Sequence, residues 1–193
     1  LACFGGGSNF GGLASPFMLH TILDGKKTEF IAAEPSSCPK LTRGKFEYDF
    51  GDEAGYTPLL PMFTLGHDFK PANIHAGGLR YHGAGMIVSQ LIKDGYMHGV
   101  DIPQLESFQA GILFSRTEGI VPAPESCHAI AATVREALKC REAGEQKTIL
   151  FNLSGHGLID MPSYDSYLNG DLMNYSLSAE ELPQYPAQVP QIM

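Results

Sequence analysis

The run Gly5-Gly6-Gly7-Ser8-Asn9 constrains the fold of this chain more than any other feature. It follows the apolar residues 1–4 and precedes a segment with helical spacing. Glycines lack a Cβ atom, so they adopt positive φ angles and let backbone N–H groups converge on an anion. Ser8 adds a hydroxyl, Asn9 adds an amide, and a helix starting here would direct its positive end to the same place. The run predicts a strand-to-helix turn that binds phosphate; the alternative is a glycine-rich turn without a ligand.

Length and composition indicate one compact domain with a small-molecule partner. The chain has 193 residues, 44% hydrophobic and 18% charged, with a formal net charge of −8. That charge gives no reason to expect binding to nucleic acid or to an anionic membrane. The sequence contains neither a run of about 20 apolar residues nor the start of a signal peptide. Because the chain begins without Met, inside what reads as a buried strand, we expect it to be the C-terminal piece of something longer.

The cysteines indicate a reducing compartment. The four of them, Cys3, Cys38, Cys127 and Cys140, show neither CxxC spacing nor the density of a disulfide scaffold. We therefore expect a cytoplasmic protein.

Helical and strand patterns alternate along the chain. Helices are expected over 9–24, 84–94, 103–113 and 124–144, and strands over 28–34, 96–102 and 147–153. In the first helix, the expected buried stripe runs through Leu13, Phe17, Leu19 and Leu23. Residues 35–71 read as a long irregular excursion because Pro, Gly and aromatic residues are scattered through them.

This alternation predicts an α/β fold with a mainly parallel sheet flanked by helices. Ligands of such folds collect beyond the carboxyl ends of the strands, where both glycine-rich loops, 5–9 and 154–157, are expected. The expected domain spans residues 1–173. The tail, 174–193, is rich in Pro and Gln and predicts an extended or disordered segment.

At the level of whole motifs, the chain resembles the tryptophan synthase beta chain family, and within it the class called type 2. The matching words are GGGSN at 5–9, HAGGLRYHG at 75–83, FSRTEGIVPAPESCHAI at 114–130 and ILFNLSGHG at 149–157, with Asp160 after the last. They occur in the family's order and span most of residues 1–172.

The resemblance implies a fold-type II pyridoxal phosphate enzyme, a lyase of tryptophan biosynthesis that joins L-serine to indole to give L-tryptophan and water. In that reading Gly5, Gly6, Gly7, Ser8 and Asn9 cradle the cofactor phosphate. Ser154, with Gly155 beside it, faces the pyridine nitrogen, and Glu118 positions or polarises the ring. From the residues alone, Ser154 could instead cap the turn after its strand, and Glu118 could be a solvated carboxylate at a helix end.

The resemblance also implies a monovalent cation site, K⁺ or Na⁺, bound by backbone oxygens near Gly5, Tyr81 and Gly83. No transition-metal site is expected. His75, His82 and His128 lack carboxylate or cysteine partners at metal-binding spacing. His156, between two glycines, is read as a surface or loop residue rather than a base, and the family does not require it for catalysis.

The chain departs from the family pattern at two places that bear on activity. Arg80 stands where better-known type 1 members carry an Asp that helps order the closed site. The family's Schiff-base lysine lies upstream of GGGSN, and no lysine of this chain, including Lys26, Lys40, Lys70 and Lys147, sits in the matching context.

We therefore expect activity only when an N-terminal half supplies that lysine, whether the chain is a split subunit or a proteolytic fragment. A beta–beta dimer is expected, and binding of an alpha chain stays open. The sequence leaves two alternatives: another fold-type II activity, such as serine or threonine dehydration, and a non-catalytic half that only stabilises its partner.

Overall fold

Three parallel strands form the central sheet of the computed structural model, which describes residues 1–177 and residue 182. The strand order is β1–β2–β5, and the bounds are β1 Ala2–Cys3, β2 Ile31–Pro35 and β5 His98–Ile102. Ala2 lies opposite Ala32 in the first pair, and Ala33 lies opposite Val100 in the second. Both pairs are parallel, which confirms the expected α/β class with a mainly parallel sheet.

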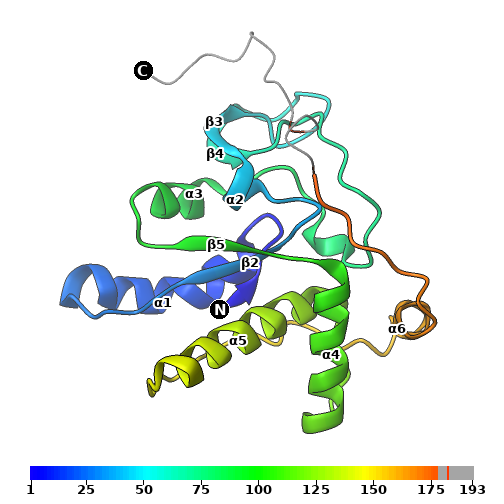
Figure 1. The fold of residues 1–193 in the computed structure, drawn as a ribbon. Coiled ribbons are helices and arrows are strands. Elements are labelled where there is room, and N and C mark those ends of the chain that lie inside the picture. The colour runs from blue at the N-terminus through cyan, green and yellow to red at the C-terminus, as the bar shows by residue number, and fades with distance from the viewer. Residues whose placement is uncertain (178–181, 183–193) are drawn as a thin grey trace.

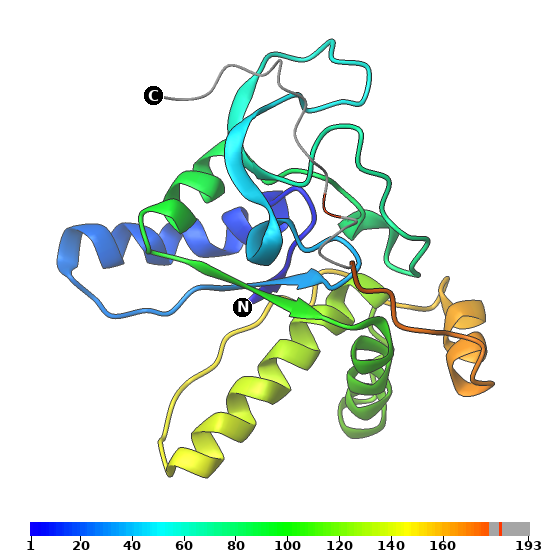
Figure 2. The same cartoon turned by 45° about the horizontal axis from the view of Figure 1, so that its top comes forward.

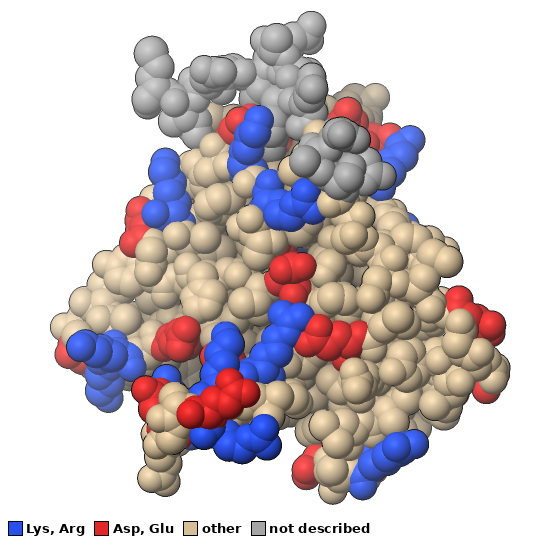
Figure 3. Space-filling view, in the orientation of Figure 1, with Lys and Arg blue, Asp and Glu red and all other residues tan. Residues whose placement is uncertain are grey.

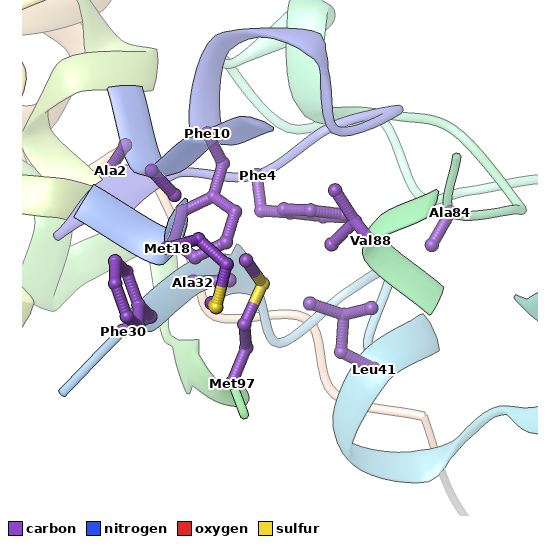
Figure 4. Packing of buried hydrophobic residues seen from close by; sticks show 11 residues of the cluster. Ala2, Phe4, Phe10, Met18, Phe30, Ala32, Leu41, Ala84, Val88 and Met97 are labelled. Carbon is purple, nitrogen blue, oxygen red and sulfur yellow. The ribbon is translucent and has the colours of Figure 1, made fainter. Parts of the chain in front are cut away.

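Helices cover both faces of this sheet (Figures 1 and 2). One face carries α1 Ser8–Asp24, α2 Lys40–Arg43 and α3 Met86–Lys93; the other carries α4 Gln104–Glu118 and α5 Pro124–Ala143. Side chains alternate between the faces. Ala2 and Ala32 pack with Phe4 and Val88 in the first core (Figure 4). Ala33 packs with the α5 side in the second core. Small residues on the strands therefore let the helices approach closely.

The helix ends follow the sequence signals. Gly25 follows α1 and Gly144 follows α5, and both adopt the left-handed conformation that favours glycine at a helix end, with φ of 66° each. α5 begins at Pro124 with Glu125 in its first turn and carries Arg141 in its last turn, as its dipole favours. The expected helices and the strands at 28–34 and 96–102 are thus confirmed, with shifts of a few residues at their ends.

The expected buried stripe of α1 is wrong. Its buried residues are Phe10, Ala14 and Met18, at i, i+4 and i+8, whereas Phe17 and Leu23 are exposed. The large apolar side chains Phe17 and Leu23 predicted that their face of α1 would be buried, but this face is exposed in the structure. The core position at 14 needs a small residue, and Ala14 carries little hydrophobic signal in a sequence pattern.

The expectation of an irregular excursion over 35–71 is also wrong. Residues 35–71 contain α2 and an antiparallel hairpin of β3 Lys45–Asp49 and β4 Leu60–Thr64. The rings of Phe46 and Phe63 pack edge to face across the pair, with centroids 5.5 Å apart. The two strands are stabilised by contacts with each other, which a local sequence pattern does not show. The residues between them, rich in Gly and Pro, also hide the alternation typical of strands.

Residues 147–153 do not form the buried strand that their composition predicts. The segment is extended and bonded to Leu1 at two points: the Leu1 ammonium donates to the Leu150 carbonyl (2.8 Å), and the Asn152 amide donates to the Leu1 carbonyl (3.1 Å). Its residues are exposed or half-buried. These two backbone hydrogen bonds do not make a ladder in the described residues. A further helix that the sequence patterns did not predict comes after it, α6 Met161–Leu168.

The described part of the predicted tail is held against the domain. Gln104 donates a hydrogen bond to the Met173 carbonyl (2.8 Å), the Leu105 amide donates to the Asn174 side chain (2.9 Å), and Arg43 donates to the Leu177 carbonyl. Residues 174–177 form neither helix nor strand. The rest of the predicted tail, apart from residue 182, lies outside the described residues.

The surface is mixed in charge on the face drawn in Figure 3, where Lys and Arg side chains are interspersed with Asp and Glu. Among the described residues, no helix combines the length and apolar character that crossing a bilayer requires.

The contact between α4 and α5 requires a residue without a side chain at position 111. A Cβ atom on Gly111 would lie 2.5 Å from Cys127 Sγ and 2.9 Å from the Tyr164 hydroxyl. We expect Gly111→Ala to lower the free energy of unfolding by about 1–3 kcal/mol, because the buried neighbours must move. Thermal or urea unfolding measures it.

Gly12→Ala is the matched control. Gly12 is also inside a helix, but nothing lies within 4 Å of its added Cβ. This substitution is expected to raise stability by about 0.5–1 kcal/mol. Equal effects of the two substitutions would contradict the packing argument.

Candidate functional site

The glycine loop at residues 5–7 joins the carboxyl end of β1 to the first turn of α1. Gly7 is the N-cap residue, with φ of 110°, and the first helical hydrogen bond runs from the Gly11 amide to the Gly7 carbonyl (2.8 Å). The amides of Ser8, Asn9 and Phe10 therefore have no acceptor within the helix. Together with the helix dipole, they form a site suited to an anion.

Close packing explains why this loop is made of glycine. A Cβ atom on Gly5 would overlap the carbonyl oxygen of Gly78, and one on Gly7 would lie 3.0 Å from the ring of Phe4. The Gly85 amide donates to the Gly6 carbonyl (2.8 Å) and fixes the loop from the other side. Side chains at Gly5 or Gly7 would therefore prevent the loop from adopting this conformation.

Ser154 lies at the N-terminal end of α5, at the end of the segment bonded to Leu1. Its hydroxyl is 3.0 Å from the Ser126 hydroxyl, and its amide donates to the same oxygen (3.1 Å). Ser126 is fully buried in the first turn of α5, while Ser154 is exposed. Ser126 therefore holds Ser154 in place, and the Ser154 hydroxyl remains accessible to a ligand.

A chain of side-chain contacts links Ser154 to the glycine loop. Cys3, at the end of β1, has its Sγ 3.5 Å from the Ser154 hydroxyl. The Asn9 amide donates to the Cys3 carbonyl and lies 3.3 Å from Cys3 Sγ. Asn152 donates to Asn9 Oδ1 (2.6 Å). Burial raises the pKa of the Cys3 thiol, so it stays neutral near pH 7.

The structure thus brings together the motifs at 5–9, 75–83, 114–130 and 149–157. Gly5 packs on Gly78, the Gly78 amide donates to Glu125 Oε1 (2.9 Å), and Ser126 bonds Ser154. The N-terminal ends of α1 and α5 both belong to this cluster. The arrangement can bind the phosphate of a ligand at α1 and a polar atom of the same ligand at Ser154.

Glu118 and Glu125 differ in their relation to this cluster. Glu118 is the exposed last residue of α4, at the end of the helix that points away from the sheet (Figure 1). Glu125 is half-buried and bonded to the Gly78 amide, and its charge contributes to the raised pKa values of Cys3 and Asp160, for which burial is the first cause. Sequence reasoning missed Glu125, although an acidic residue in the first turn of a predicted helix was visible in the motif.

Gly155 lies beside Ser154, and its carbonyl accepts a hydrogen bond from the Ala123 amide (2.9 Å). This bond places it next to the start of α5. Of the residues predicted to bind a cation, Tyr81 uses its carbonyl to accept the thiol of Cys38 (3.0 Å), and a Cβ on Gly83 would meet Met62 Sδ at 2.5 Å.

Arg80 braces the loop before the motif at 75–83. Its guanidinium donates to Asn73 Oδ1 (3.1 Å) and to the Pro71 carbonyl (3.0 Å).

The histidines are engaged in local contacts. His75 Nδ1 lies 2.9 Å from the Ser163 hydroxyl, His82 Nε2 lies 2.8 Å from the Phe50 carbonyl, and the His156 ring accepts from the Leu158 amide. Across the described residues, no cluster of three or more His, Cys, Asp or Glu side chains is placed to hold a metal ion.

A family model described as "Pyridoxal-phosphate dependent enzyme" matches residues 1–155. The tryptophan synthase beta chain 2 of Aquifex aeolicus is 55% identical over 175 residues, which are 89% of this chain and 40% of that protein. Its counterpart from Methanothermobacter thermautotrophicus is 56% identical over 173 residues, again 89% and 40%. This chain therefore spans about 40% of the length of these relatives.

A crystal structure of a fungal L-serine ammonia-lyase from Rhizomucor miehei has a similar fold. Its TM-score is 0.62 at 14% sequence identity, over 89% of this chain and 49% of that one. Together with the family model, this likeness confirms the expected fold-type II architecture, and the named relatives confirm the resemblance to tryptophan synthase beta chains.

His128 provides a test of burial beside the site. It is fully buried in α5; its Nδ1–H donates to the Pro124 carbonyl (2.9 Å), and its Nε2 has no hydrogen-bond partner among the described residues. Burial lowers its pKa from 6.5 to about 4. Because the unfolded state then binds more protons, stability is full above pH 6.5 and falls as the pH drops toward 4, by about 3 kcal/mol in total.

His128→Asn keeps a donor for Pro124 and removes the titration. The measurement is denaturant unfolding of both forms at pH 7, 5.5 and 4.5. We expect the stability gap between the two forms to shift in favour of the variant as the pH falls. A gap that stays constant over this range would contradict a buried neutral His128.

Proposed function

The chain belongs to the family of pyridoxal-phosphate dependent enzymes, and on that premise we propose that it forms the phosphate- and ring-binding part of a tryptophan synthase beta chain. The observation that carries the proposal is the joining of the glycine loop at α1 to Ser154 at α5 through Cys3 and Asn9. The proposed reaction condenses L-serine with indole to L-tryptophan and water. The names of the relatives at 54–56% identity support this choice.

The residues present fit a phosphate group at the glycine loop. Gly5 and Gly7 fit tightly against Gly78 and Phe4, where a Cβ would clash, and the first-turn amides of α1 have no acceptor within the helix. Ser8 is exposed and Asn9 is half-buried at the same helix end. In the proposal residues 5–9 hold the cofactor phosphate through backbone N–H groups.

The residues at the other end fit a neutral pyridine nitrogen. The Ser154 hydroxyl can donate a hydrogen bond to that nitrogen, while Ser126 fixes the position of the hydroxyl. The Cys3 thiol is neutral as well. Both side chains that would face the nitrogen are thus neutral hydrogen-bonding groups, and neither would supply it with a negative charge. When bound, the cofactor supplies an electron sink for loss of the amino acid's α-proton; these side chains moderate that sink by withholding a charge.

Beside Glu118, which the family resemblance implies near the ring, we propose a second carboxylate at this site, Glu125. Glu125 is held by the Gly78 amide within the cluster of motifs, whereas Glu118 is exposed at the far end of α4. Glu125 thereby orients the 75–83 segment against Gly5.

In the proposal, the lysine that binds the cofactor lies outside these 193 residues. Lys26 is exposed, Lys40 is buried behind the loop, Lys70 pairs with Glu53, and Lys147 pairs with Glu145. None of these four joins the contacts that link the glycine loop to Ser154. Activity then requires a second polypeptide segment, and the partners proposed are that segment and a second beta chain. An alpha chain is not assigned.

The four cysteines are free thiols, which fits the proposed cytoplasmic location.

Complementation tests this function. The chain is mixed with the part of Aquifex aeolicus tryptophan synthase beta chain 2 that it does not span, and cofactor is added. We expect tryptophan from L-serine and indole only in the mixture. Borohydride reduction followed by mass spectrometry should place the cofactor label on a lysine of the added part. A label on a lysine of this chain would contradict the proposal.

The same assay separates the alternatives. Pyruvate without tryptophan, in the presence of indole, would indicate a serine dehydratase. Cofactor binding that restores no turnover would indicate a non-catalytic half.

Ser154→Ala tests the assignment of the ring contact. Loss of one hydrogen bond of about 1–1.5 kcal/mol predicts a roughly tenfold fall in kcat/KM for the complemented enzyme. Ser115→Ala is the matched control, since Ser115 bonds only the Gly111 carbonyl within α4 among the described residues, and it should leave kcat/KM within about twofold. The assignment fails if the two substitutions have equal effects.

A further inference from the structure

Lys40 is a charged residue that the proposed function does not use. It is the first residue of α2, and both its side chain and that of Glu34 have no exposed surface. Fully buried lysines are rare because removing an ammonium from water is costly unless it is paired. The desolvation of the Lys40 ammonium must therefore be offset by interactions with its neighbours.

The surroundings of the ammonium resemble those of a bound ion. Lys40 Nζ lies 4.0 Å from Glu34 Oε2, 3.4 Å from the Cys38 carbonyl, and 5.6 Å from the centroid of the Phe4 ring. Both polar distances are long for hydrogen bonds, and the Cys38 carbonyl is its sole hydrogen-bond acceptor within the described part of the chain. A carboxylate, a carbonyl and an aromatic face together suit a compact positive charge.

Glu34 needs this charge rather than another hydrogen bond. Its oxygens already accept from the Leu41 amide, the Thr42 amide and the Thr42 hydroxyl, at 2.8–3.1 Å. Burial raises the pKa of Glu34, and the Lys40 charge opposes that shift most strongly. The ammonium therefore neutralises a carboxylate that closes the turn between β2 and α2.

Two routes connect the ammonium to the glycine loop. Through Phe4 it reaches Gly7, where an added Cβ would lie 3.0 Å from the Phe4 ring. Through Cys38 it reaches Tyr81, because the Cys38 thiol donates to the Tyr81 carbonyl and the Tyr81 ring covers Gly6. Figure 4 shows Phe4 among the side chains of this core, between Phe10 and Val88, and its ring is fully buried.

We propose that Lys40 is a positioning residue. Its ammonium takes the place of a bound monovalent cation and holds the glycine loop in the conformation that binds an anion. Truncation to alanine would leave a site of the same character, with a carboxylate, a carbonyl and a ring. A free NH₄⁺ or K⁺ ion can occupy it. This inference concerns the chain by itself and does not depend on the reaction catalysed.

The test compares the unchanged 193-residue chain with Lys40→Ala and Lys40→Met at pH 7.5. Thermal unfolding is measured in NH₄Cl, KCl and choline chloride at equal ionic strength. The midpoint of the unchanged chain in each salt is the reference with which the variants are compared. Lys40→Ala should melt about 10 °C lower in choline and recover at least half of that loss, saturably, in NH₄⁺ or K⁺.

Lys40→Met is the matched control because it fills the same volume without a charge. It should melt lower in every salt and show no cation-specific recovery. If Lys40→Ala is unfolded in choline, the same titration follows the refolded fraction by circular dichroism. Absence of recovery in NH₄⁺ and K⁺, or equal recovery of the two variants, would overturn the proposal.

Hydrogen–deuterium exchange of the peptide covering residues 1–10 reports on the loop itself. Exchange should be about tenfold faster in Lys40→Ala in choline and should slow again with NH₄⁺. A general loss of stability would instead accelerate exchange across the whole core, and the exchange rates would be the same with each cation. Unchanged exchange in this peptide would also overturn the proposal.

Discussion

The site depends on one close approach of backbone to backbone. Gly5 packs directly against the Gly78 carbonyl, and Gly7 turns into α1 with a positive φ against the Phe4 ring. Both contacts require the absence of a side chain. They bring the 75–83 segment onto the carboxyl end of β1, which is where a parallel sheet presents its ligand sites.

The parallel pairing of β1 with β2 positions the other parts. It places the end of β1 beside the start of α5, so that Cys3 contacts Ser154 and Ser126 fixes the Ser154 hydroxyl. Glu34, near the end of β2, lies beside the buried Lys40, whose ammonium lies over the Phe4 ring. The glycine loop, residues 5–7, therefore lies near the positive ends of α1 and α5. The buried Lys40 ammonium contacts it through the Phe4 ring.

Much of the fold could be predicted from local patterns. Gly25 and Gly144 mark helix ends because a left-handed residue is inexpensive only for glycine. The errors have physical causes. The buried face of α1 passes through Ala14, whose small size gives little signal, and the β3–β4 hairpin depends on a cross-strand Phe46–Phe63 contact. The 147–153 segment has the composition of a strand, but in the described residues it makes only two backbone hydrogen bonds, both with Leu1.

By itself, the sequence determined the glycine turn, the α/β alternation and the family resemblance, because each is written in consecutive residues. Only the tertiary structure shows how the two carboxylates of this motif lie: Glu125, at the start of α5, is bonded to Gly78, whereas Glu118, at the end of α4, is exposed. It also decided that Lys40 is buried against Glu34 and Phe4. Such contacts join residues distant in the chain, and no local pattern encodes them.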